Sequence, residues 1–154
     1  MSSAGSIFIS YRRSDSAYAT ERIHERLVAT FGQERLFLDV DSIPKGIDFI
    51  QSLDEALSQC QVLLVVMGPD WLRAPADDGT RRLDHPDDPV RLEIESALER
   101  DIPFIPVLLD GMDIPEEAAL PQSLHRLRRR QGVRVGTGGR FSADMDQLIQ
   151  ALTG

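Results

Sequence analysis

The segment Val62-Leu63-Leu64-Val65-Val66 is continuously apolar and is followed closely by Gly68-Pro69. An apolar run of this length, closed by a glycine and a proline, predicts a strand that is buried on both of its faces. Strands of this kind are typical of parallel sheets, whose crossover helices cover the two sides. The segment therefore indicates the central strand of an α/β domain.

Short apolar runs alternate with segments of helical periodicity on either side of this strand. The other predicted strands are 7–9, 36–38, 104–109 and 133–135. The apolar faces of the predicted helices span 19–31, 50–57, 92–98, 121–127 and 141–152. Five strands that alternate with five helices predict a flavodoxin-like three-layer α/β domain. Its five-stranded parallel sheet has the order 2-1-3-4-5, with helices on both faces.

The sequence also predicts the first residues of two helices and one long connection between secondary-structure elements. Asp15 or Ser16 is expected to cap the first helix, because short polar side chains accept hydrogen bonds from free backbone N–H groups there. Asp88 is the expected cap of the helix that begins with Pro89. The stretch 72–88 is irregular and rich in Asp, Pro and Arg, and a connection of this length in a small domain is often functional.

Composition excludes several classes of function. The 154 residues include 17 Lys plus Arg and 25 Asp plus Glu, and the net charge of −8 disfavours binding to nucleic acid or anionic membranes. The single cysteine, Cys60, cannot form an internal disulfide or a cysteine-based zinc cluster. Residues 1–6 have neither the basic nor the apolar region of a signal peptide, so we expect none there, and no apolar run reaches membrane-spanning length. We expect a cytoplasmic protein with a disordered tail at residues 1–6 and one domain at residues 7–154.

The sheet order predicts where a ligand binds. Open α/β sheets bind ligands at the carboxyl ends of the strands beside the point where the strand order reverses, here between the first and third strands. The residues at those ends are Ser10 to Arg13 and Gly68 to Trp71, with Asp39 after the second strand. Cations, a hydroxyl, aromatic rings and glycine backbone at one edge suit a phosphorylated, heteroaromatic ligand.

Two common types of site do not match this sequence. No glycine-rich dinucleotide fingerprint follows the first strand, and no G-x-x-x-x-G-K-[ST] motif occurs. A phospho-receiver needs an aspartate at the end of the third strand and an acidic pair after the first. Gly68 and Arg12-Arg13 stand at those positions, so the receiver interpretation fails.

Segments along nearly the whole chain resemble, in order, the conserved boxes of Toll/interleukin receptor (TIR) domains, including microbial members that cleave NAD. The matching segments are Ile7–Arg13, Phe37–Gly46, Ser58–Pro69, Val90–Leu98 and Phe104–Gly111. Some NAD-cleaving members have an acidic or aromatic residue near the ribose in the loop after the second strand, and the corresponding stretch here is 44–48, with Phe49 one position further on. The sequence also has Ile114 where some members have a tryptophan.

The resemblance places the family's catalytic carboxylate at Glu93. Nicotinamide in NAD is already a cationic leaving group, so its release needs no general acid. One carboxylate can both stabilise the oxocarbenium ribose that develops and orient the ribose hydroxyls. Arg12 and Arg13 are expected to meet the diphosphate, and Tyr11 or Trp71 to stack on a ring.

The remaining predicted contacts lie around the same edge of the sheet and in the loop after the second strand. The further substrate-binding residues are Ser10, Asp39, Lys45 and Gly68. The resemblance implies that neighbouring copies join through an interaction loop, which comprises Asp41, Ser42, Ile43, Pro44, Lys45 and Gly46.

Each of these residues also has a simpler interpretation. Glu93 could be a solvated glutamate on a helix surface. Arg12 and Arg13 could form exposed ion pairs, which contribute about 0–1 kcal/mol. Trp71 could fill the end of a strand as a hydrophobic plug, and Asp39 could be an ordinary turn residue.

Two functions of different classes follow. The first is an NAD nucleosidase that uses no cofactor or metal and leaves ADP-ribose or a cyclic isomer. The resemblance implies that it acts as a homo-oligomer or filament with an attached or associated sensor domain, and makes antiviral defence by NAD depletion plausible. The second is a non-catalytic scaffold that joins TIR domains, in which Glu93 is incidental. We favour the enzyme, because Glu93 and the arginine-bearing first box occur together.

Overall fold

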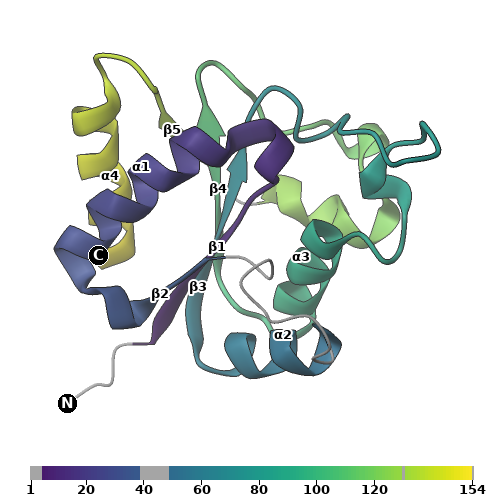
Figure 1. Ribbon diagram of the computed structural model, residues 1–154, viewed down its shortest axis with the longest axis horizontal. Coiled ribbons are helices and arrows are strands. Elements are labelled where there is room, and N and C mark those ends of the chain that lie inside the picture. Colours follow the sequence, from purple (N-terminus) through teal and green to yellow (C-terminus); the bar gives the residue numbers. More distant parts are fainter. Residues whose placement is uncertain (1–4, 39–48, 130, 154) are drawn as a thin grey trace.

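A five-stranded sheet lies at the centre of the molecule. The computed structural model describes residues 5–38, 49–129 and 131–153. The strands are β1 (Ser6–Ser10), β2 (Leu36–Leu38), β3 (Cys60–Met67), β4 (Phe104–Leu109) and β5 (Val133–Val135). Their order is β2-β1-β3-β4-β5, and every neighbouring pair is parallel (Figure 1). The predicted flavodoxin-like architecture and its strand order are confirmed.

Helices cover both faces of this sheet. α1 (Arg13–Phe31) and α4 (Phe141–Thr153) lie on one face, and α2 (Phe49–Ser58) and α3 (Pro89–Glu99) lie on the other (Figure 1). Shorter 3₁₀ helices are Gln33–Arg35, Arg82–Asp84, Glu117–Ala119 and Gln122–Arg129.

The segment 121–127, which was predicted to be an α-helix, belongs to the 3₁₀ helix Gln122–Arg129. Its buried side chains, Leu124 and Leu127, are three residues apart. That spacing repeats once per turn of a 3₁₀ helix, so one narrow apolar row suffices to hold the segment against α3.

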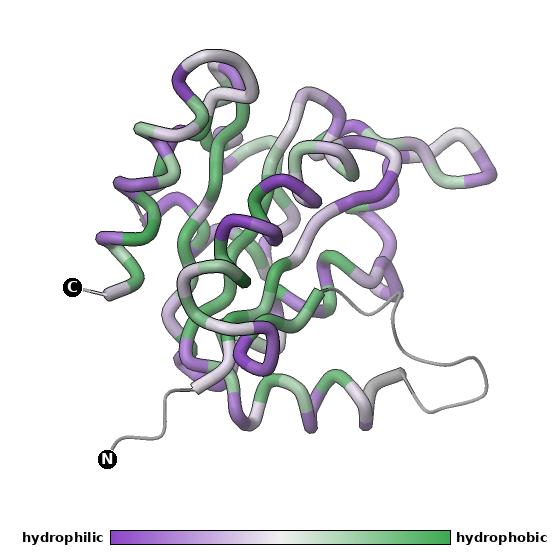
Figure 2. The backbone as a smooth tube through the Cα atoms, turned by 60° about the vertical axis from the view of Figure 1, so that its left-hand side comes forward, coloured by the Kyte–Doolittle hydropathy of each residue, from purple (hydrophilic) through white to green (hydrophobic). Residues whose placement is uncertain are grey.

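The continuous apolarity of β3 has a direct structural reason. Alternate side chains of a strand point to opposite faces of the sheet, and both faces of β3 are covered by helices. Leu63, Val65 and Met67 belong to the core under α2 and α3. Val62, Leu64 and Val66 belong to the core under α1 and α4. Figure 2 shows the resulting pattern of apolar strands inside and polar residues along the outer helix surfaces.

The start of α1 differs from the prediction. The residue at the cap position is Arg12, which makes no capping hydrogen bond through its side chain. Ser16 has non-helical backbone angles and kinks the first turn. The carboxylate of Asp15 instead accepts hydrogen bonds from the backbone N–H groups of Gly68 and Asp70. The side chain of Asp15, which was expected to cap α1, therefore binds the turn after β3 instead.

The amino-terminal boundary of the sheet lies at Ser6, which pairs with Cys60 in β3. The predicted tail at residues 1–6 thus includes one residue of β1, and its first four residues lie outside the described part of the chain. None of the helices within residues 5–38, 49–129 and 131–153 has the length and apolarity needed to cross a bilayer.

Candidate functional site

The helix that carries Glu93 begins as the sequence predicts. Pro89 occupies its first turn, and the side chain of Asp88 accepts a hydrogen bond from the backbone N–H of Arg91 at 3.2 Å. Proline suits this position because the first N–H groups of a helix have no partner within the helix. Asp88 satisfies one of the remaining free donors.

Glu93 is completely buried, with 0% of its surface exposed. It lies on α3 between Leu92 and Ile94, which pack into the core shared by α2, α3 and the sheet. The simpler interpretation of Glu93 as a solvated surface glutamate is therefore wrong. Removing a carboxylate from water is costly, and glutamates are rarely buried completely unless they are paired or hydrogen-bonded. Glu93 is thus part of the interior of the domain.

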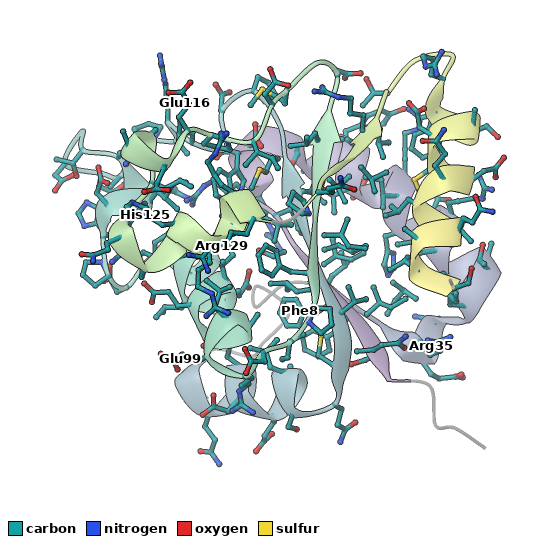
Figure 3. The ribbon with its side chains drawn as sticks, turned by 180° about the vertical axis from the view of Figure 1, so that it is seen from behind. Phe8, Arg35, Glu99, Glu116, His125 and Arg129 are labelled. Atoms are coloured by element: carbon teal, nitrogen blue, oxygen red, sulfur yellow. The ribbon has the colours of Figure 1, made fainter. Side chains whose placement is uncertain are left out.

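The neighbouring glutamate on α3 has an ordinary environment. Glu95 is only partly buried and accepts hydrogen bonds from Nε of Arg91 at 2.8 Å and from the hydroxyl of Ser123 at 2.5 Å. Figure 3 shows Glu99 and Arg129 on the outer side of this region, and Phe8 among the core side chains. Of the two glutamates in the matched box, the one that the resemblance singled out is the one enclosed by the fold.

Arg12 is also buried, and this corrects its predicted role. Its Nη1 and Nη2 donate hydrogen bonds to the two carboxylate oxygens of Asp88 at 2.9 and 2.8 Å. Its Nε donates to the backbone carbonyl of Trp71 at 2.9 Å. The side chains of Arg12 and Asp88 are 1% and 2% exposed. Because its donors face protein acceptors, Arg12 does not offer its guanidinium to a diphosphate in this structure.

The side chain of Trp71 is likewise part of the protein interior. The side chain is 0% exposed, and the guanidinium of Arg12 lies 5.8 Å from its ring centre. In this structure the enclosed ring faces no open ligand site, which agrees with the interpretation of Trp71 as a hydrophobic plug. Its indole nitrogen has no hydrogen-bond partner among the described residues, and the same holds for the buried hydroxyl of Ser10 at the carboxyl end of β1.

Gly68 lies directly after β3 and makes its contact through its backbone N–H group. Its N–H donates to Oδ2 of Asp15 at 2.8 Å, and the N–H of Asp70 donates to Oδ1 at 2.6 Å. Burial raises the pKa of Asp15, although the two backbone hydrogen bonds and the nearby Arg12 act in the opposite direction. Asp15 therefore connects the start of α1 to the turn after β3.

Two predicted contacts remain accessible at this edge of the sheet. Arg13 is exposed and lines a hollow of about 410 Å³ together with Pro69 and Asp110. Tyr11 is half-buried and packs against the core under α1 and α4. A second hollow of about 420 Å³ lies beside the start of α3 and is lined by Asp77, Arg82, His85 and their neighbours.

The other predicted residues are not placed. Asp39, Lys45 and the interaction loop 41–46 lie outside the described residues. The described ranges contain no group of three His, Cys, Asp or Glu side chains arranged to hold a metal ion.

Sequence reasoning missed two features that the structure brings together. Asp15 was assigned only to a helix cap, and the pairing of Asp88 with Arg12 was not anticipated. The partners are separated by 53 and 76 positions in the chain. No local pattern reports contacts of that range, although the predicted sheet order does place the ends of β1 and β3 side by side.

Comparisons with known proteins agree with this fold. The profile of the TIR domain family matches residues 7–149. The NAD(+) hydrolase sarm1 of Drosophila melanogaster is 27% identical over 129 residues, which cover 82% of this chain and 9% of that protein. The TIR domains of the activated Roq1 resistosome, which directly recognises the pathogen effector XopQ, superpose with a TM-score of 0.66 at 12% identity. That match covers 97% of this chain and 99% of the other. The chain belongs to the TIR domain family.

Proposed function

We propose that this domain is an NAD nucleosidase and that Glu93 is its catalytic residue. The observation that carries the proposal is the complete burial of Glu93 on α3. The similarity to a protein named as an NAD(+) hydrolase supports the same chemistry. A carboxylate held away from water can stabilise a positive charge that develops beside it, which is the role that the proposed reaction needs.

The proposed reaction breaks the bond between nicotinamide and ribose. Nicotinamide leaves with the bonding electron pair and becomes neutral, while positive charge develops on the ribose. The carboxylate of Glu93 stabilises that charge, and its effect is strengthened where water is excluded. Water or the adenine ring then attacks the ribose, giving ADP-ribose or a cyclic isomer. The chemistry requires no cofactor, because NAD is the substrate.

The burial of Glu93 also supports activation by self-assembly. With no surface exposed, its carboxylate is out of reach of a ligand as large as NAD. Activity therefore requires a rearrangement that opens the site, and we propose that assembly into a homo-oligomer or filament through the loop 41–46 supplies it. Ser10, Tyr11, Arg13, Asp39, Lys45 and Gly68 remain the proposed surroundings of the substrate.

The decisive test compares two glutamates on the same helix. Nicotinamide release from NAD is followed over a range of protein concentrations for the wild type, Glu93→Gln and Glu95→Gln, with assembly measured by light scattering. We expect release to rise more steeply than linearly with concentration, to vanish in Glu93→Gln, and to persist in Glu95→Gln. Assembly without release in the wild type would favour the scaffold function instead.

A further inference from the structure

A buried ion pair connects the end of β1 to the start of α3. Arg12 and Asp88 make two parallel hydrogen bonds of 2.9 and 2.8 Å. Such a bidentate ion pair fixes the relative orientation of the two side chains as well as their distance, because two N–H groups of the planar guanidinium must each reach one carboxylate oxygen. The first turn of α3 is therefore held at a defined angle relative to β1.

Asp88 has a second function in the same contact. Its Oδ2 also accepts a hydrogen bond from the backbone N–H of Arg91, so the carboxylate that pairs with Arg12 is also the cap of α3. Glu93 lies five residues further along this helix, about 7.5 Å along its axis. A helix is stiff over that length, so whatever orients its cap also orients Glu93.

Arg12 is held in turn by the chain after β3. Its Nε donates to the carbonyl of Trp71, and this turn is fastened to α1 through the carboxylate of Asp15. The contacts thus join three segments that are far apart in sequence: the residues after β1, the turn after β3 and the start of α3. All three lie at the edge of the sheet where open α/β folds bind ligands.

Stability alone does not account for this pair. Burying two charges costs much of what their attraction returns, and replacing a buried ion pair with neutral side chains is often neutral or stabilising. What a neutral pair does not supply is the fixed geometry of two charge-assisted hydrogen bonds. A role in orientation therefore explains the pair better than a role in holding the fold together.

We propose that Arg12 and Asp88 are positioning residues that orient Glu93 for nicotinamide release. The inference rests on the proposed function of Glu93. Neither residue touches the substrate in this account; both act through the placement of α3.

The test uses two variants that separate positioning from folding. Asp88→Asn keeps a capping side chain of the same shape but leaves the charge of Arg12 buried without its anion, so it is expected to lower the melting temperature. The double variant Arg12→Met/Asp88→Asn removes both charges and is expected to recover most of that loss. Leu148→Ala is the matched control, because it destabilises the core on the opposite face, under α4.

The expected result is that stability recovers in the double variant while catalysis does not. In assembled protein that remains folded at the assay temperature, kcat for nicotinamide release should fall at least about tenfold in both Asp88 variants. KM should change by less than about twofold, because neither residue is in contact with NAD. Leu148→Ala should retain wild-type kcat. Recovery of kcat together with stability in the double variant would overturn the inference.

Hydrogen exchange provides a measurement that does not depend on activity. Backbone amides in the first two turns of α3 should lose protection selectively in the folded double variant, whereas Leu148→Ala should reduce protection broadly. Unchanged protection at α3 would contradict the inference. If assembled wild type releases no nicotinamide, yet the double variant shows the selective loss of protection, the proposed enzyme is rejected while Arg12 and Asp88 are retained as the pair that orients α3.

Discussion

The carboxylate of Asp15 accepts a hydrogen bond from the backbone N–H of Gly68 across 53 residues of sequence. The approach is close enough that a β-carbon built on Gly68 would lie 2.7 Å from Oδ1 of Asp15. Contacts this short do not occur between real atoms of these types, so any side chain at position 68 displaces the carboxylate or the turn. The close approach of Asp15 on α1 thus explains why the residue after β3 is a glycine.

Gly68→Ala should therefore destabilise the protein. We expect a loss of about 1–3 kcal/mol in the free energy of unfolding, as for other additions of a methyl group to a closely packed site. Gly138→Ala is the control, since a β-carbon there meets no atom within 4 Å. Urea denaturation measures both variants. Equal stability of Gly68→Ala and the wild type would show that Asp15 does not approach Gly68 this closely.

Two aspartates should titrate on opposite sides of the ordinary value of 3.8. Burial raises the pKa of Asp15, whereas hydrogen bonds from the hydroxyl and the N–H of Thr137 lower the pKa of Asp110. Carboxyl ¹³C resonances followed from pH 7 downward should therefore show Asp15 gaining its proton before Asp110. The reverse order would contradict the environments described for these two groups.

The hydroxyl of Thr137 should be the main cause of the lowered pKa of Asp110. Thr137→Val removes this donor, so the pKa of Asp110 should move toward 3.8. A carboxylate with a lowered pKa in the folded state contributes stability above its ordinary pKa and loses it as the pH falls through the lowered value. Any advantage of the wild type over Thr137→Val should accordingly diminish below about pH 4.

The central strand should dominate the stability of the domain. Leu64 is completely buried in β3, so Leu64→Ala should lower the free energy of unfolding by about 2–5 kcal/mol through lost apolar contact and a residual cavity. Tyr18 on α1 is 72% exposed, and Tyr18→Ala should change the free energy of unfolding by less than about 0.5 kcal/mol. Similar losses at the two positions would be inconsistent with this arrangement of the core.

Tryptophan fluorescence tests the corrected role of Trp71 directly. It is the only tryptophan of the chain and is completely enclosed. Its emission should be shifted to short wavelength and should resist quenching by acrylamide until the protein unfolds. Emission typical of a solvated indole, with efficient quenching, would return Trp71 to the set of candidate ligand contacts.

The sequence was sufficient to predict the fold because one strand carried a clear physical signature. The apolar run 62–67 has no polar face, and only a sheet covered on both sides satisfies such a strand. The alternation of strands and helices then favoured the order that is common in sheets of this class, and this is the order observed. The segment 121–127 was predicted less well, since two buried leucines three residues apart suit an α-helix and a 3₁₀ helix alike.

The site was predicted only in part, for a reason that lies in the range of the contacts. Position in a matched box singled out Glu93, and its burial separates it from Glu95. The inward orientation of Arg12 could not be predicted from the matched box, because its partner Asp88 is 76 residues away. Charged residues at a strand end are equally suited to a ligand and to a buried partner until the tertiary structure is known.

The most direct test of the central claim is the rate of nicotinamide release by assembled wild-type protein relative to Glu93→Gln at the same concentration and degree of assembly. We expect robust release by the wild type and none above the uncatalysed background from Glu93→Gln, in a variant that remains folded. Equal rates in the two proteins, or no release from assembled wild type, would contradict the assignment of Glu93 as a catalytic carboxylate.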